Sequence, residues 1–319
     1  MNKRSKKIVI VSASLMACGV ILGGAGFAMG GYPGVQISRH GIFSTSTKSE
    51  PCELAKTKLD SFSKVKISVD SYADIQILPS DDNSFYLEYL LDRSYGEPEY
   101  QVKDDILTVH HNNQGVGFIN LTFETFDTLP DTHIQLYVPE GKVLDYLDIY
   151  NDSGDVMISD VHVKDSKISI DYGDLTLNNS DLDSLDLHLD SGDFITDDTE
   201  ISILNLQNEY GDNTLNNYKG SYITADLDSC SLMIDAVELD SLECDIEYGD
   251  VNLALPGKLD TYTFDISTEY GDILLPKSAP RGYFTNRNDD SEVYYQTDGD
   301  GKHMIQVKAD SGDVSVSER

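Results

Sequence analysis

The sequence predicts an all-β protein, a single-stranded parallel β-solenoid with coils of about 19 residues that follows an N-terminal transmembrane helix. Three features predict it: a Gly-Asp pair that recurs every 19 residues from residue 154, apolar residues that alternate on both sides of that pair, and a long apolar stretch near the N-terminus. A short fixed period is typical of stacked copies of one small unit, which bury a continuous core only as a column. The marker glycines of the repeat are Gly154, Gly173, Gly192, Gly211, Gly249, Gly271 and Gly312.

Two short strands flank each Gly-Asp turn. Apolar residues lie seven, five and three positions before the glycine, as at Leu185, Leu187 and Leu189. They return two and four positions after it, as at Val251 and Leu253. Alternation with a period of two is typical of strands with one inward face, so we expect these residues to lie in the core.

A corner and a third, shorter strand complete each coil. Weaker apolar pairs such as Val237 and Leu239 predict the short strand, and the Asn pairs at 178–179 and 216–217 predict corners. No stretch has a 3.6-residue period, which excludes a helical repeat, and a propeller blade needs about 40 residues. A sandwich of two sheets is the alternative fold.

The residue before the marker glycine alternates between a small and a large side chain. Ser occupies this position in every second coil and Tyr in the coils between them, at Ser153, Ser191 and Ser229 and at Tyr172, Tyr210 and Tyr248. A small residue above a large one predicts side chains that interdigitate at one corner of the column. A tyrosine platform on which a ligand stacks is the alternative.

The first 30 residues predict a basic cytoplasmic head and a membrane anchor. Four basic residues precede an apolar stretch from Ile8 to Met29, long enough to cross about 30 Å of hydrocarbon. Positive charge on its N-terminal side places the N-terminus in the cytoplasm and the rest of the chain outside. The alternatives are a cleaved signal peptide ending near Ala28 and a lipoprotein processed at Cys18. The predicted location is a bacterial cell membrane, crossed once.

The rest of the chain divides by composition. Residues 31–58 contain Gly, Pro, Ser and Thr without periodicity, which predicts a linker. Residues 59–141 predict an N-terminal β region that caps the column and includes a degenerate coil around Ala73, and residues 142–319 predict the regular solenoid with a C-terminal cap. The four cysteines differ in repeat phase, which favours free thiols. Further strands are expected at 86–91, 101–110 and 134–138, and loops or hairpins at 112–128 and 281–301.

The chain beyond residue 30 is strongly acidic, with 56 acidic and 19 basic side chains and a net charge of −37. Such a surface repels nucleic acid and favours cations or basic peptides. Acidic residues recur two positions before and one position after the marker glycine, which predicts two rows of carboxylates along the column. The candidate Ca²⁺ ligands in these rows are Asp152, Asp155, Asp171, Asp174, Asp190, Asp193, Glu209, Asp212, Glu247 and Asp250.

Turn chemistry explains much of both rows. An Asp at a turn accepts a backbone N–H, and Gly supplies the positive φ. Glu209, Glu247 and Glu269 fit this explanation less well, because an extra methylene spoils the geometry. Paired carboxylates are also ligands that Ca²⁺ prefers, so weak Ca²⁺ binding is the alternative. No other cofactor is expected.

No catalytic constellation is evident. Basic residues are few in the regular coils, the seven His show no metal-ligand spacing, and the motifs of a nucleophile elbow and a phosphate loop do not occur. Paired carboxylates hydrolyse glycosides in many enzymes, but an acidic chain contains such pairs everywhere. The sequence therefore favours a non-enzymatic protein over a hydrolase or lyase of wall polysaccharide.

Four segments carry a resemblance to a known family: Ile168–Leu177 (ISIDYGDLTL), Leu185–Phe194 (LDLHLDSGDF), Phe62–Val69 and Ile134–Pro139. Together they resemble a bacterial family of β-strand-repeat "putative adhesin" domains of largely unknown function, over roughly residues 60 to 316. Its members include membrane-anchored accessory proteins of Lia-type envelope-stress operons. The resemblance implies an accessory or sensing role outside the membrane, with no catalytic residues to transfer.

The sequence thus predicts a non-enzymatic interaction or stress-sensing module, anchored in the membrane and exposed outside it. The expected partners are cationic peptides or a partner membrane protein, which would bind along a negatively charged sheet. A Ca²⁺-dependent surface adhesin is the alternative within the class of binding proteins. Nothing in the residues specifies an oligomeric state.

Overall fold

The computed structural model describes residue 19 and residues 34–38, 41–44, 51–111, 117–122, 131–286, 293–299 and 303–319. The chain forms two compact units. The smaller unit contains a three-stranded antiparallel sheet in the order β2–β1–β9, formed by β1 (Gly34–Ser38), β2 (Gly41–Ser44) and β9 (Gly117–Thr122), and the short helix η1 (Arg93–Tyr95). The larger unit spans Cys52–Leu91, Glu97–Asn112 and Asp131–Arg319 and holds the repeat.

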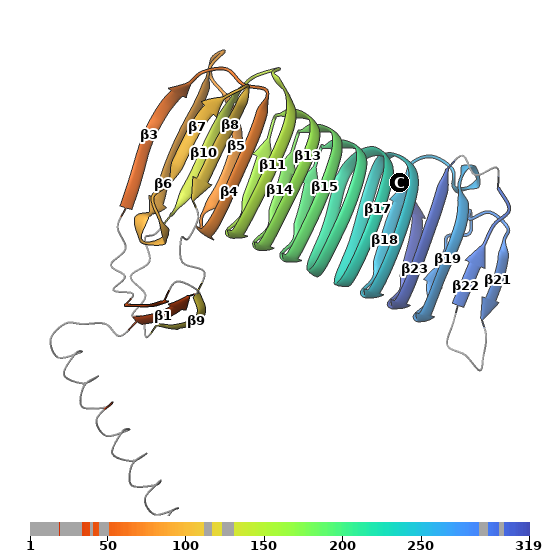
Figure 1. Ribbon diagram of the computed structural model, residues 1–319. Helices are drawn as coiled ribbons and strands as arrows, with labels where there is room; N and C mark the ends of the chain where they lie inside the picture. The colour runs from red at the N-terminus through yellow and green to blue at the C-terminus, as the bar shows by residue number, and fades with distance from the viewer. Residues whose placement is uncertain are drawn as a thin grey trace, which may run out of the picture. The chain divides into compact units, whose positions relative to one another are not determined.

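Each regular coil contains one long and one short strand. The long strands are β11 (Val143–Ser153), β13 (His162–Tyr172) and β15 (Asp181–Ser191), and the short strands are β12 (Val156–Ser159), β14 (Leu175–Asn178) and β16 (Phe194–Asp197). Each strand pairs in parallel with its counterpart 19 residues further on, so Leu147 lies beside Ser166, and Ser166 beside Leu185. Figure 1 shows β11, β13 and β15 side by side in chain order. The predicted all-β, solenoid-like fold is confirmed.

The column begins with a degenerate coil, as the sequence predicts around Ala73. Its strands are β4 (Lys64–Tyr72) and β5 (Asp74–Ser80), which pair in parallel with β11 and β12. On their other sides, β8 (Ile106–His111) pairs in parallel with β4, and β10 (His133–Pro139) pairs in parallel with β5. Ile67 and Val69 are buried in the same way as their counterparts in later coils.

Antiparallel strands close this end of the larger unit. β6 (Phe85–Asp92) pairs with β10, and β7 (Glu99–Lys103) pairs with β8, while β3 (Pro51–Leu59) pairs with β6. The single strand predicted at 101–110 is wrong: residues 99–111 form a hairpin. Asp104 and Asp105 turn the chain there, with φ angles of +51° and +65°, a conformation that Asp tolerates better than most residues.

The C-terminal coils are stacked out of chain order. After β17 (Glu200–Tyr248) and β18 (Val251–Leu255), the chain forms η2 (Leu259–Thr261), β19 (Thr263–Tyr270), β20 (Ile273–Leu274), β21 (Tyr283–Asn286), β22 (Val293–Gln296), β23 (Met304–Ser311) and β24 (Val314–Glu318). β23 lies between β17 and β19, so Val307 pairs with Cys244 on one side and with Ile266 on the other. β24 lies likewise between β18 and β20. Figure 1 shows this insertion of β23.

The inward positions predicted from the alternation are buried, with one exception. Leu185, Leu187 and Leu189 are fully buried, and Leu253 is 2 % exposed. Val237, predicted to face the core, is 38 % exposed, and its neighbour Ala236 is buried instead. Both lie in β17, which runs for 49 residues without a break, so no turn resets the alternation where the sequence places a corner.

The marker glycines stack on one another. Gly173 has a φ of +147°, and a Cβ atom added to it would lie 2.2 Å from the carbonyl oxygen of Gly154 in the preceding coil. Only glycine fits such a close approach of two backbones. The predicted corners are confirmed, with Asn179 and Asn217 in the left-handed region at φ angles of +45° and +49°.

The predicted anchor lies outside the described residues, apart from Gly19. Within the described part of the chain, no helix is both long and apolar enough to span a membrane. The segment 31–58, predicted to be a linker, contains β1, β2 and most of β3. These strands have no repeat partner in the sequence, which is why periodicity does not detect them.

Candidate functional site

The acidic row that follows the marker glycines is a ladder of hydrogen bonds. The Oδ1 atom of Asp155 accepts the backbone N–H of Asp174 at 3.0 Å, and the Oδ1 atom of Asp174 accepts that of Asp193 at 2.8 Å. The same contact joins Asp74 to Asp155, Asp193 to Asp212, Asp250 to Asp313, and Asp313 to Asp272. One carboxylate oxygen in each of these coils therefore satisfies the turn of the next coil, which supports the structural interpretation of this row.

The second acidic row lies two positions before the marker glycines and is solvent-accessible. Its members Glu209 and Glu247 are exposed, and Asp152, Asp171 and Asp190 are half-buried. The hydroxyl of Tyr150 donates to the Oδ2 atom of Asp171 at 2.9 Å. At the first coil, burial and then the charges of Asp152 and Asp171 raise the pKa of Asp70. The carboxylates thus act on one another along the column.

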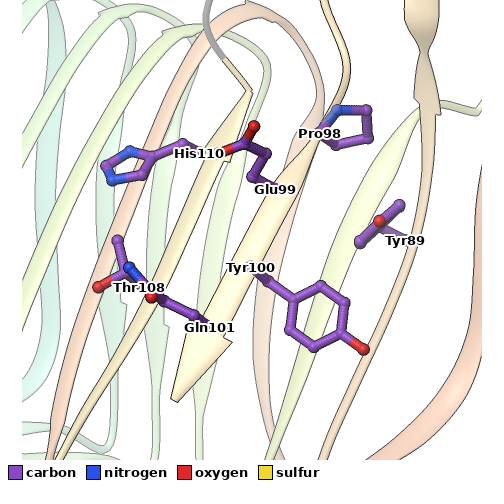
Figure 2. Close-up of a pocket in the computed structure, with 7 residues that line it drawn as sticks. All are labelled: Tyr89, Pro98, Glu99, Tyr100, Gln101, Thr108 and His110. Atoms are coloured by element: carbon purple, nitrogen blue, oxygen red, sulfur yellow. The ribbon is translucent and has the colours of Figure 1, made fainter. Parts of the chain in front are cut away.

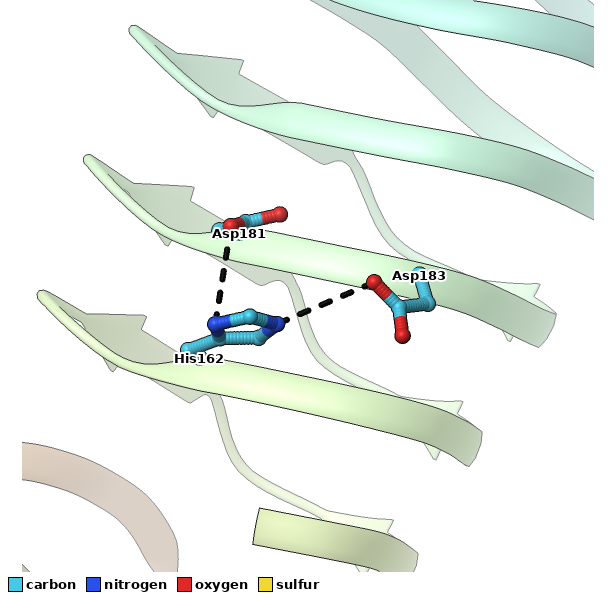
Figure 3. A group of neighbouring side chains, drawn as sticks. All are labelled: His162, Asp181 and Asp183. Carbon is cyan, nitrogen blue, oxygen red and sulfur yellow. Dashed lines mark ion pairs between the residues drawn. The ribbon is translucent and has the colours of Figure 1, made fainter. Parts of the chain in front are cut away.

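The predicted Ca²⁺ ligands do not form a compact cluster. Among the described residues, one group of three His, Cys, Asp or Glu side chains brings its ligand atoms within 4.8 Å of one another, and it contains none of the ten candidates. It consists of His162, Asp181 and Asp183, and Figure 3 shows the imidazole facing both carboxylates. The binding of Ca²⁺ by the two rows stays a prediction.

The exposed group around His162 escapes a search for local spacing. The Nδ1 atom of His162 lies 3.6 Å from Asp181, and its Nε2 atom lies 3.7 Å from Asp183. His162 and Asp181 are 19 residues apart, so one coil brings them into register on β13 and β15. The repeat period itself is the signal that finds such neighbours.

The alternating Ser and Tyr residues do not interdigitate, so that prediction is wrong. The tyrosines are exposed, from 53 % at Tyr210 to 64 % at Tyr172. Tyr72 of the first coil and Tyr270 of the last belong to the same row and are 57 % and 66 % exposed. The row lies on the outside of the turn, where no neighbouring element covers a large side chain.

Two open hollows lie at the ends of the larger unit. One, of about 400 Å³, is shown in Figure 2 and is lined by Tyr89, Pro98, Glu99, Tyr100, Gln101, Thr108 and His110. The other, of about 350 Å³, is lined by residues that include Asp260, Asp298 and His303. Neither lining contains a Ser or Cys nucleophile.

A Ser–His pair does occur, but it is inaccessible. The hydroxyl oxygen of Ser71 lies 2.7 Å from Nδ1 of His111, and the two residues are 2 % and 0 % exposed. A nucleophile and its base need access to substrate, so this contact serves packing. Burial raises the pKa of the Cys230 thiol to about 11 and that of Cys244 to about 12, so both stay protonated at neutral pH. Both are free, as is Cys52.

Solved structures from several bacteria resemble the chain at low identity. A "putative cell adhesion protein" from Clostridium sporogenes is 10 % identical, with a TM-score of 0.28, and the match covers 85 % of this chain and 100 % of that one. A "putative lipid binding protein" from Parabacteroides distasonis is 13 % identical, with a TM-score of 0.41, and a "putative adhesin" from Parabacteroides merdae is 12 % identical, also at 0.41. Both matches cover 85 % of this chain and 97 % of the other. No curated protein matches.

The family assignment rests on the sequence of the repeat region itself. The family described as Toastrack DUF4097 matches residues 62–317, which include every coil of the column and both of its ends. This range agrees with the resemblance inferred from the repeat motifs. The chain belongs to the Toastrack DUF4097 family.

Proposed function

We propose that the chain is a non-enzymatic binding module, held at the outer face of a bacterial membrane by its N-terminal segment, that captures cationic ligands along its column. The observation that carries the proposal is the order of the accessible carboxylates, which lie one per coil at the same position of successive coils. A net charge of −37 beyond residue 30 attracts cations over the distance of a Debye length, roughly 8 Å in physiological salt.

Repulsion within the row favours a polycationic ligand. Neighbouring coils lie about 5 Å apart, so each adjacent pair of like charges costs roughly 0.8 kcal/mol at the dielectric of water. The raised pKa of Asp70, to which Asp152 and Asp171 contribute, is a sign of this repulsion. A ligand with several positive charges removes it at several coils at once, and a monovalent cation does so at one.

The predicted topology supplies the location. A basic head and an apolar stretch from Ile8 to Met29 would hold the acidic column on the outside of the membrane. An accessory role in the response to envelope stress follows from the family resemblance and from a ligand class that includes membrane-active cationic peptides. Such a role requires binding and no catalytic turnover.

Titration of the full-length chain, in nanodiscs of zwitterionic lipid, with an oligoarginine peptide tests the proposal. We expect binding that weakens steeply as NaCl increases, because the attraction is electrostatic. A variant with Asp152→Asn, Asp190→Asn and Glu247→Gln should bind more weakly at every salt concentration. Equal binding by the variant and the parent chain, or no binding at low salt, would contradict the proposal.

A further inference from the structure

The alternation of Ser and Tyr at the turn is a property of the surface and not only of the sequence. In chain order Tyr248 is followed by Tyr270, which would break it. The insertion of β23 places Ser311 between them, because Ser311 pairs with Tyr248 on one side and with Tyr270 on the other. The order along the column is Tyr72, Ser153, Tyr172, Ser191, Tyr210, Ser229, Tyr248, Ser311 and Tyr270.

These five tyrosines, the tyrosine ladder, do not stack on one another. Strands in a sheet lie about 4.8 Å apart, so tyrosines in every second coil are separated by about 9.6 Å. Aromatic rings contact each other when their centroids are about 4.5 to 7 Å apart. Among the described residues, no ring contact includes a member of the ladder. The serine coils therefore leave a notch between successive rings.

The notches fit a planar cation. A cation is attracted to the face of an aromatic ring when it lies within about 6 Å of the centroid. A guanidinium group seated over a serine coil would lie roughly 4.8 Å from the ring on each side, within reach of both. Carboxylates flank the rings, as Asp171 and Asp174 flank Tyr172 in the sequence. The nearby charge of Asp74 is the main reason that the pKa of Tyr72 is raised.

The spacing selects the conformation of the ligand. A polyproline II helix rises about 3.1 Å per residue with three residues per turn, so every third side chain recurs at about 9.3 Å. Over the four intervals of the ladder this differs from the tyrosine spacing by about 1 Å in total. An extended strand repeats its side chains at about 6.8 Å, and seven residues of an α-helix at about 10.5 Å, so both lose register sooner.

We propose that the tyrosine ladder binds an extended basic peptide in the polyproline II conformation, with an Arg at every third residue seated in the notch at a serine coil. The inference rests on the proposed function, since it names the class of cationic ligand. A second copy of the chain carries the same negative charge and is repelled, and a neutral glycan gains nothing from the carboxylates.

Two peptides of identical composition test the periodicity. One carries four Arg-Pro-Pro repeats, and the other has the same residues with the Arg positions unevenly spaced. Both are titrated into the full-length chain in zwitterionic nanodiscs, with binding measured by calorimetry. We expect the regular peptide to bind at least several-fold more tightly than the irregular one. Equal affinities would overturn the ladder and leave the proposed function standing, whereas no binding of either peptide would overturn both.

Variants of the chain test the notches directly. Serine already occupies the turn position in alternate coils, so Tyr172→Ser, Tyr210→Ser and Tyr248→Ser together should fold normally. We expect this variant to bind the regular peptide about 10- to 100-fold more weakly, and the irregular peptide with little change. Tyr222→Ser is the control, because Tyr222 is an exposed tyrosine outside the ladder. An equal loss for both peptides would contradict the proposal.

Filling the notches separates the ladder from a mere count of aromatic rings. Ser191→Tyr and Ser229→Tyr place a ring in every coil from Tyr172 to Tyr248. More aromatic surface would strengthen binding if only the number of rings mattered. We expect weaker binding of the regular peptide, because the added rings occupy the space of the guanidinium groups. Tighter binding by this variant, with an unchanged unfolding temperature, would overturn the proposal.

Discussion

The Oδ1 atom of Asp193 accepts the backbone N–H of Asp212, one coil further along the column, at 2.8 Å. The contact ties one turn to the next through a side chain, in addition to the parallel pairing of the strands. It also assigns a structural role to a carboxylate row that the sequence offers as a set of cation ligands. Several predictions about the stability of the column depend on this relationship.

Removing one rung of the aspartate ladder should destabilise the column. Asp193→Ala leaves the N–H of Asp212 without its acceptor, and we expect a loss of about 1 to 2 kcal/mol in the free energy of unfolding. Asp193→Asn keeps an oxygen at the same place and should cost less. Asp186, exposed on the same coil, is the control, since Asp186→Ala should change stability by under about 0.5 kcal/mol. Chemical denaturation measures all three, and equal stability of the first and the control would refute the prediction.

Calcium should not stabilise the chain specifically. The Oδ1 atoms of the row are occupied by backbone N–H groups, and the other row forms no compact ligand cluster. Thermal unfolding with millimolar Ca²⁺ should therefore match that in NaCl of equal ionic strength. A bound ion at about 100 times its Kd would add about 2.7 kcal/mol, and a rise of that size would establish the Ca²⁺-dependent alternative.

A single methyl group at a marker glycine should be severely destabilising. Gly173→Ala would place its Cβ 2.2 Å from the carbonyl oxygen of Gly154 and force alanine into a positive φ, so we expect a loss of about 3 kcal/mol or more. Gly141 is the matched control. It also has a positive φ but nothing within 4 Å of the added atom, so Gly141→Ala should cost about 1 kcal/mol. Similar losses at both positions would show that the close approach is unimportant.

The charge of Asp70 should make the column less stable as pH rises. Burial and the carboxylates of Asp152 and Asp171 raise its pKa in the folded chain, so the folded chain holds this proton to a higher pH than the unfolded chain does. Its contribution to stability is therefore present below the unfolded pKa of about 3.9 and is lost as pH rises through the folded pKa. We expect Asp70→Asn to raise the unfolding temperature at neutral pH and to leave it unchanged in strong acid. A variant less stable than the parent at neutral pH would contradict this.

Loss of the C-terminal strands should open the column from within. β23 and β24 each pair on both sides, so a chain ending at residue 302 leaves four strand edges without partners. We expect such a chain to aggregate and to lose protection from hydrogen exchange in β19. A substitution that preserves the backbone, such as Lys308→Ala, should leave exchange in β19 unchanged. Retained protection in the truncated chain would show that β19 is held by other contacts.

The repeat could be predicted because its period is written in residues such as Leu185, Leu187 and Leu189, whose inward direction depends only on local alternation. The exposure of Tyr172 could not, since a small and a large residue in successive coils also fit a buried corner. Val237 and Ala236 exchanged roles because β17 continues through a position where other coils turn. The contact of His162 with Asp181 follows from the period, but only after the coils are known to stack in register.

The place of β23 couples the completion of the fold to the order in which the chain is made. A polypeptide that emerges N-terminus first can add coils in sequence as far as Val251–Leu255, but the strand at 263–270 then waits for residues 304–311 before it has a parallel neighbour. A product broken off before that point keeps exposed strand edges, which are substrates for proteases and seeds for aggregation. The inserted strand thus acts as a latch that only a full-length chain can close.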